Sequence, residues 1–152
     1  MSEIKIQFPD KSTKKFHSGI SCLEIVKSIS NSLAKKVLVA SYNEEMIDLS
    51  TKLTTDGKIK FYTWEDDEGK STFWHSSAHL LAESIESLYP GVKFGIGPPI
   101  TNGFYYDIDF NDYDVSKINL SKIEERFLNL SRGNLEFKRS EVSKKDAVSY
   151  FK

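Results

Sequence analysis

The sequence predicts an α+β fold, with a β-grasp unit at residues 1–63 followed by a second, α/β unit at residues 64–152. Two observations lead to this expectation. The first part alternates short strand patterns with one helical pattern, and the composition shifts at Thr63-Trp64-Glu65, after which a new helical pattern begins. A chain of 152 residues is long enough for one ordinary domain or two small ones.

The first unit should begin with a hairpin. Residues 4–8 alternate apolar and polar side chains with period two, Pro9–Ser12 has turn chemistry, and Lys14–Phe16 resumes the strand. Ser21 and Glu24 then form a capping box at the start of a helix. The apolar face expected for this helix is Leu23, Ile25, Val26, Ile29 and Leu33.

Two more strands complete the first unit, a buried one at Val37–Ala40 and an alternating one at Ile59–Tyr62. Short strands around a single helix in about sixty residues indicate a β-grasp, a sheet with one helix across it. The acidic stretch Glu65–Lys70 has no core pattern, so it is expected to be the linker or hairpin tip between the units.

The next segment is predicted to be a helix with Ser71 or Thr72 as its N-cap, ending at Tyr89-Pro90-Gly91. Its apolar positions are Trp74, Ala78, Leu81, Ile85 and Leu88. His75 and His79 lie one helical turn apart at the border of this stripe. Imidazole titrates near neutral pH, so such a pair can ligate a metal or position and deprotonate a water.

Beyond this helix, three glycines and two prolines separate short strands, with a tight turn expected at Asn102-Gly103. Phe104–Phe110 alternates like one strand. Two helices are expected at Ser121–Leu130 and Lys144–Phe151. The second helix still has an apolar face when the sequence stops, which predicts that this chain is truncated.

Composition excludes several classes of protein. A net charge of −1 gives no overall basic field, so contact with nucleic acid must be local, with candidates at Lys11, Lys14 and Lys15 among others. One cysteine, Cys22, excludes an internal disulfide framework. No apolar run is long enough to span a membrane and no signal peptide is apparent, so a cytoplasmic protein without a membrane partner is expected.

The order of motifs resembles the N-terminal region of bacterial threonyl-tRNA synthetases. The features that carry the resemblance are the β-grasp, the Trp74–Ala82 segment with its two histidines, Ile96–Ile100, and the Gly103–Asp107 sequence GFYYD. It implies a TGS domain at residues 1–63 and the first, partial section of an editing domain at residues 64–152. In this family the editing domain hydrolyses serine mischarged onto threonine tRNA.

The resemblance assigns roles to three residues. His75 and His79 match the two editing histidines, and Tyr106 matches a residue near the editing pocket that binds substrate. A downstream lysine and a Cys-x-x-x-His segment, which complete the pocket in the family, do not occur in this chain. The chain by itself is therefore expected to be inactive, although the resemblance implies that its parent is a threonine-specific aminoacyl-tRNA synthetase.

The same resemblance implies cofactors and partners for the parent enzyme. ATP, Mg and Zn are expected in its catalytic domain, which lies outside this chain, and no cofactor or metal is expected here. The expected partner is threonine tRNA, and the parent is expected to be a homodimer through the catalytic domain.

Two other functions stay open. TGS domains also occur in regulatory proteins, so the chain could be a binding module, although the histidine motif argues against this. Alternatively, the histidines could belong to a metal-dependent hydrolase, but Ser76 stands where the HExxH motif has its glutamate.

Overall fold

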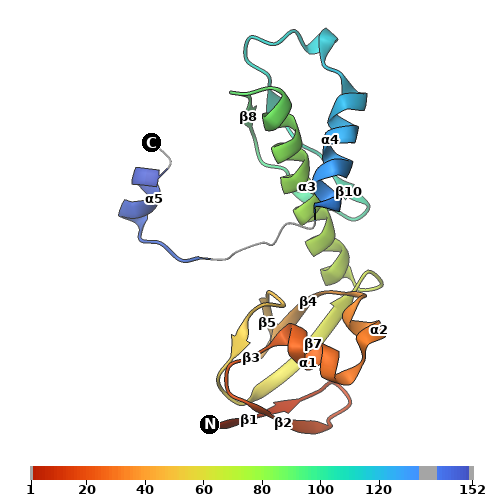
Figure 1. Ribbon diagram of the computed structural model, residues 1–152, viewed down its shortest axis with the longest axis vertical. Helices are drawn as coiled ribbons and strands as arrows, with labels where there is room; N and C mark the ends of the chain where they lie inside the picture. Colours follow the sequence, from red (N-terminus) through yellow and green to blue (C-terminus); the bar gives the residue numbers. More distant parts are fainter. Residues whose placement is uncertain (1, 134–139, 151–152) are drawn as a thin grey trace.

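Two units follow one another along the chain, with helix α3 (Asp67–Leu88) running from the first into the second, as Figure 1 shows. The computed structural model describes residues 2–133 and 140–150. The first unit is a mixed sheet with helix α1 packed on it, and the second consists of α3, α4 and short strand pairs. The predicted α+β fold class is confirmed.

The sheet of the first unit has the strand order β2-β1-β7-β4-β5. Its strands are β1 (Glu3–Gln7), β2 (Thr13–His17), β4 (Val37–Tyr42), β5 (Glu45–Ile47) and β7 (Gly57–Thr63). The β1–β7 pair is parallel, and the pairs β1–β2, β4–β7 and β4–β5 are antiparallel. A smaller pair joins β3 (Ile20–Ser21) to β6 (Lys52–Leu53).

Helix α1 (Cys22–Ile29) begins with the predicted capping box. The Ser21 hydroxyl accepts the Glu24 N–H at 3.2 Å, and the Glu24 carboxylate accepts the Ser21 N–H at 2.8 Å. The expectation of one helix from Leu23 to Leu33 is wrong, because Ser30 is extended and caps a separate turn, α2 (Asn31–Ala34). Ile29 is consequently 47% exposed instead of facing the core.

Alternation along the strands decides which side chains face α1. Ile4 and Ile6 of β1 and Ile59 of β7 are buried in one core together with residues of helix α1. That core consists of Ile4, Ile6, Ile20, Cys22, Ile25, Ala40, Leu53 and Ile59. Neighbouring strand residues point to the opposite face of a sheet, so Lys5, Lys58 and Lys60 face away from α1.

The junction between the units is a tight turn. The predicted linker at residues 65–70 and the predicted N-cap at Ser71 or Thr72 are wrong, because α3 already begins at Asp67. The Asp66 carboxylate accepts the Thr63 N–H at 2.8 Å and the Thr63 hydroxyl at 3.1 Å. Gly69 is buried so closely that a Cβ there would lie 1.9 Å from the Thr63 carbonyl oxygen.

The second unit packs α3 against α4 (Leu120–Arg132). Asn119 is the N-cap of α4, and its side chain accepts the Lys122 N–H at 3.0 Å. Its core is centred on Ile85, Val92 and Ile123. Two short strand pairs complete it: β8 (Lys93–Phe94) with β11 (Ile108–Asp109), and β9 (Pro99–Ile100) with β10 (Gly103–Phe104). A short 3-10 turn, η1 (Val115–Lys117), precedes α4.

Two predictions in the second unit need correction. Phe104–Phe110 is not one strand, because β10 and β11 pair with different partners and residues 105–107 between them belong to no strand. The tight turn lies at Thr101–Asn102, one residue earlier than predicted, and Gly103 follows it with a φ of +142°.

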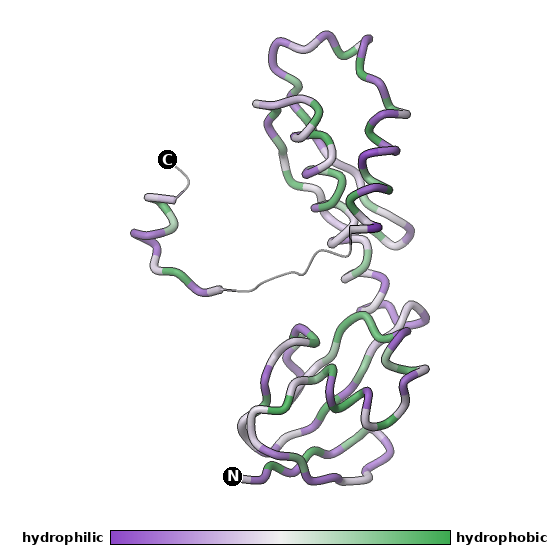
Figure 2. The backbone as a smooth tube through the Cα atoms, in the orientation of Figure 1, coloured by the Kyte–Doolittle hydropathy of each residue, from purple (hydrophilic) through white to green (hydrophobic). Residues whose placement is uncertain are grey.

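The last described helix is α5 (Lys144–Tyr150), and the predicted end at Phe151 lies outside the described residues. Hydrophobic and hydrophilic stretches alternate along both units, as expected for elements with one buried face (Figure 2). In the part of the chain that the structure describes, no helix is both long and apolar enough to cross a membrane.

Candidate functional site

The two histidines of α3 touch each other. The Nε2 atoms of His75 and His79 are 2.9 Å apart, and their ring centroids are 4.7 Å apart with planes at 70°. Both side chains are exposed. The expected pairing one helical turn apart is therefore present, at hydrogen-bond distance and accessible from solvent.

The residues between the histidines leave this pair unobstructed. Ser76 and Ser77 donate their hydroxyls to the carbonyls of Thr72 and Phe73, one turn earlier in the helix, at 2.9 and 2.8 Å. Ala78, the third residue between them, is buried. Because the serine hydroxyls are bound to the helix backbone, the imidazoles are the groups of this turn that can bind an external molecule.

A hydrogen bond between two imidazoles requires one ring to donate and the other to accept. One Nε2 therefore carries a proton while the other presents a lone pair. A water that replaced this contact would meet one donor and one acceptor, which is the arrangement needed to orient and deprotonate it.

A metal site does not fit these residues. Within residues 2–133 and 140–150, no group of three or more His, Cys, Asp or Glu side chains could hold a metal ion. A catalytic zinc usually needs three protein ligands, and His75 and His79 supply two. The described part of the chain therefore offers no third ligand that would complete a zinc site beside the histidines.

Tyr106 lies in a different group of contacts. Its ring packs edge-on against Phe94 with centroids 5.5 Å apart, and it covers Gly97, where a Cβ would lie 1.9 Å from the ring. The Tyr106 ring therefore occupies the space that a side chain at position 97 would need, which explains the glycine there. Tyr106 also lines a shallow hollow with residues of β8 and β11, and neither histidine lines that hollow.

Tyr105 lies between strands β10 and β11 and is 58% exposed. Its neighbour Tyr106 is half-buried. The exposed ring of Tyr105 is therefore the one of the two that is open for stacking with another molecule.

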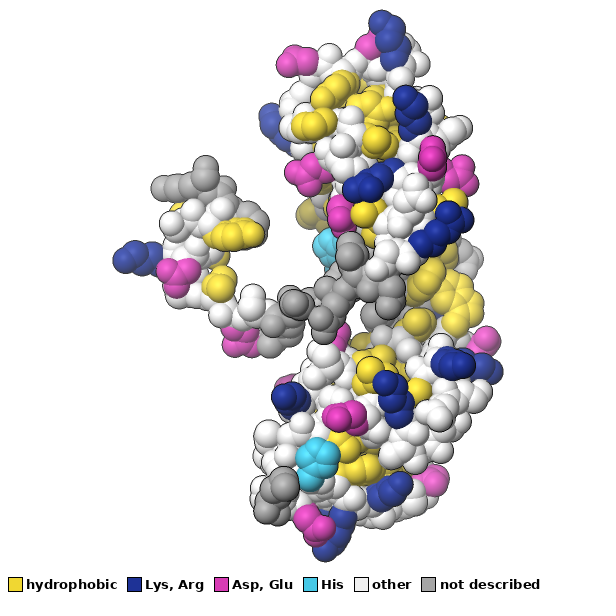
Figure 3. Space-filling model, in the orientation of Figure 1, with side chains coloured by type: hydrophobic (Ala, Val, Ile, Leu, Met, Phe, Trp, Pro, Cys, Tyr) yellow, Lys and Arg dark blue, Asp and Glu magenta, His cyan; other side chains and the backbone are white. Residues whose placement is uncertain are grey.

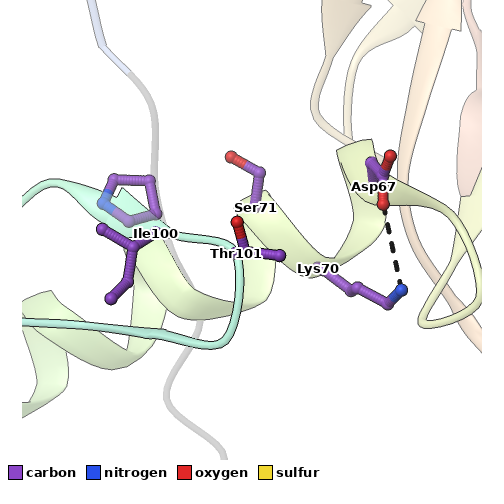
Figure 4. A pocket seen from close by; sticks show the side chains of 6 residues that line it. Asp67, Lys70, Ser71, Ile100 and Thr101 are labelled. Carbon is purple, nitrogen blue, oxygen red and sulfur yellow. Dashed lines mark ion pairs between the residues drawn. The ribbon is translucent and has the colours of Figure 1, made fainter.

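A second hollow lies beside the first turns of α3 (Figure 4). Asp67, Lys70 and Ser71 come from the helix, and the β9–β10 turn closes the other side with Pro99, Ile100 and Thr101. The Lys70 ammonium is 3.8 Å from the exposed Asp67 carboxylate, so this ion pair is loose. The hollow is open and has a mixed polar and apolar lining, and neither histidine lines it.

An aromatic cluster lies at the junction and was not predicted from the sequence. Trp64 lies 5.0 Å from Phe73 and 5.6 Å from Trp74 between ring centroids, and Trp74 in turn approaches Phe104 at 6.3 Å. Trp64 and Phe73 are each 42% exposed, and apolar side chains reach the surface where the two units meet (Figure 3). The adjacent aromatic pair at residues 73–74 was the available signal, but its partner Trp64 is brought near only by the turn at residues 64–66.

Comparison with known proteins identifies the first unit. The TGS domain family matches residues 4–63, which cover the sheet from β1 to β7. Residues 4–63 form a TGS domain. A TGS domain has the β-grasp fold, in agreement with the strand order described above.

The similarity to curated proteins extends over both units. The chain is 52% identical over 148 residues to the threonine–tRNA ligase of Cytophaga hutchinsonii, which covers 97% of this chain and 23% of that protein. The corresponding ligases of Flavobacterium johnsoniae and Parabacteroides distasonis are 46% and 47% identical over 98% and 97% of this chain, and 23% of each protein is covered. The chain thus spans about a quarter of the length of these relatives. The resemblance predicted from the motifs is confirmed: the chain matches the TGS-containing N-terminal region of these ligases.

Proposed function

We propose that this chain is the TGS and editing region of a threonine–tRNA ligase, and that residues 64–152 form the first part of its editing domain. The whole protein would attach threonine to its tRNA, and this region would take part in hydrolysing seryl-tRNA. The observation that carries the proposal is the exposed His75–His79 contact at 2.9 Å, in a segment that lies within the similarity to the ligases.

A separate hydrolytic site is needed because a single binding pocket has a limited ability to discriminate between threonine and serine. A pocket that accepts threonine cannot strongly reject serine, because one missing methyl group changes binding by only about 1–3 kcal/mol. Hydrolysis of the smaller product at a separate site restores accuracy. Similarity that continues beyond the TGS domain to 97% of the chain supports this proposal over a stand-alone TGS binding module.

The histidines have complementary roles in the proposed reaction. A water held between His75 and His79 would give its proton to the imidazole with the free lone pair as its oxygen attacks the ester carbonyl. The other imidazole would donate a hydrogen bond to the developing oxyanion, or would give its proton to the leaving ribose oxygen as the ester C–O bond breaks. Tyr106 is the proposed substrate-binding residue, and it would act from the neighbouring β8–β11 side.

The remaining components of the ligase lie outside this chain in the proposal. ATP, Mg and Zn would belong to its catalytic domain, since the described residues offer no set of three metal ligands. The whole protein would work in the cytoplasm as a homodimer with threonine tRNA as its partner.

The test uses the whole ligase that contains this sequence. His75→Ala or His79→Ala should slow hydrolysis of seryl-tRNA by roughly a hundredfold or more, the contribution of general acid–base catalysis, and should leave threonylation nearly unchanged. His17→Ala is the matched control, because it removes the third histidine of the chain from the TGS sheet. Hydrolysis at the normal rate in both α3 variants would contradict the proposed role.

A further inference from the structure

The face of the TGS sheet turned away from α1 gathers lysines from segments far apart in the sequence. Lys58 and Lys60 alternate with the buried Ile59 on β7, so both point to this face. Gln7 of β1 is the register partner of Lys58 and shares its side of the sheet. In Figure 1, α1 lies in front of the sheet, so this face looks away from the viewer.

These side chains surround one open hollow of about 520 Å³. Lys11 reaches it from the β1–β2 turn, Lys58 and Lys60 from β7, and Gln7 from β1. One carboxylate, Glu44 in the β4–β5 turn, lines the same hollow. Three ammonium groups against one carboxylate make this a local positive site on a chain whose net charge is −1.

We propose that this face binds the phosphate backbone of an RNA strand, with Lys11, Lys58 and Lys60 as the phosphate contacts. Lys58 and Lys60 are two strand residues apart, about 7 Å, so their ammonium groups are spaced to contact different phosphates of one strand. The Lys60 ammonium lies 4.4 Å from the Tyr62 ring centroid, and this contact favours its position on this face. The identity of the RNA, the ligase's tRNA, rests on the proposed function.

The site gives affinity without reading sequence. Ammonium groups contact phosphates as point charges, whereas base recognition needs donors and acceptors directed at base edges. The sheet face would therefore hold the RNA while the histidines act elsewhere. Binding here should depend strongly on salt, because each phosphate contact releases condensed counterions.

The experiment measures binding of this chain to a fluorescein-labelled RNA hairpin with a single-stranded 3′ end, by fluorescence anisotropy over a range of salt concentrations. The double variant Lys11→Gln, Lys58→Gln leaves the Lys60–Tyr62 contact intact. It should weaken binding roughly tenfold at low salt and reduce the slope of log K against log salt by about 1.5–2. The matched control is Lys27→Gln, Lys35→Gln, which removes the same charge from α1 and from the C-cap of α2 and should change both quantities little.

A third variant tests the opposite direction. Glu44→Gln removes the one carboxylate of the hollow and should tighten RNA binding about two- to threefold. Thermal melting of every variant establishes that each is folded.

Equal losses in the two double variants, or unchanged affinity and slope in Lys11→Gln, Lys58→Gln, would overturn the site. Displacement of the RNA by poly-glutamate as readily as by unlabelled RNA would instead identify an acidic protein as the partner and refute the RNA assignment. None of these outcomes depends on the histidines, so the hydrolysis test of His75 and His79 can fail while this site stands, and the reverse.

Discussion

Gly69→Ala should destabilise the junction between the two units, although alanine is the better helix former. The added Cβ would lie 1.9 Å from the Thr63 carbonyl oxygen, and ordinary contact begins at 3.4 Å. The start of α3 must therefore move about 1.5 Å away from the end of β7. Because the obstacle is backbone, no side-chain rotation relieves the overlap.

The size of the effect follows from the hydrogen bonds of the turn. The movement would lengthen the bonds from the Thr63 N–H and hydroxyl to the Asp66 carboxylate, now 2.8 and 3.1 Å, and that from the Asp66 N–H to the Thr63 carbonyl, now 3.1 Å. Each such bond contributes about 1 kcal/mol. Replacing glycine in a helix regains about 1 kcal/mol at most, so we expect a net loss of about 1–3 kcal/mol.

The assay is urea unfolding followed by tryptophan fluorescence. The chain has two tryptophans, Trp64 and Trp74, and their rings are in contact at the junction, so this signal reports the junction itself. Thr72→Ala is the matched control, because it introduces the same residue one turn later in α3. We expect it to change stability by no more than about 0.5 kcal/mol. A Gly69→Ala chain as stable as the original, with unchanged native fluorescence, would refute the close-approach argument.

Three further predictions concern other parts of the chain. Burial raises the pKa of the Cys22 thiol to about 11, with the nearby Asp48 carboxylate as a smaller cause, so the folded state keeps this proton where the unfolded state has lost it. The free energy of unfolding should therefore fall as pH rises from about 9 towards 11, and less steeply in Cys22→Ala; equal slopes in urea titrations would contradict this. Glu44→Gly should stabilise the TGS domain by about 0.5–1 kcal/mol, because Glu44 has a φ of +72° that glycine adopts without strain, and an unchanged or lower melting temperature would count against it. The purified chain should bind no stoichiometric zinc by elemental analysis and should not deacylate seryl-tRNA above background; deacylation that His79→Ala abolishes would show that the chain is sufficient.

The features of the fold that depend on residues close together in the sequence were predicted well. The capping box at Ser21 and Glu24 involves neighbouring residues only, and the structure contains both of its hydrogen bonds. The strands at residues 4–8, 37–40 and 59–62 were found within a few residues, because alternation with period two reflects which face is buried. The parallel β1–β7 pairing depends on contacts across the whole unit, which no local pattern specifies.

The start of α3 was mispredicted for a physical reason. Asp67 and Glu68 followed by Gly69 have the composition of a linker, yet acidic side chains stabilise the first turn of a helix. The glycine is present because the Thr63 carbonyl occupies the place of a side chain, not because the backbone is a loop. The sequence alone cannot distinguish a glycine in a flexible linker from a glycine that makes room for a neighbouring carbonyl, and the structure shows the second.

In the candidate site, too, one feature could be predicted from the sequence and another could not. The His75–His79 contact follows from helical spacing alone, so the sequence could predict it. The environment of Tyr106 could not be predicted, because it depends on contacts with Phe94, which belongs to the β8–β11 pair, and with Gly97, which lies between β8 and β9. Whether Tyr106 acts with the histidines stays a prediction.

The arrangement of α3 connects the two proposed activities physically. The helix starts in van der Waals proximity to the end of β7, and β7 carries Lys58 and Lys60 on the proposed RNA face. The same helix carries His75 less than two turns after Gly69. An RNA strand held by the sheet would therefore be held relative to the histidines by one strand, one tight turn and one helix. If this account is right, Gly69→Ala should leave the affinity for the RNA hairpin unchanged in the isolated chain and slow seryl-tRNA hydrolysis in the whole ligase, because it moves α3 without altering the lysines.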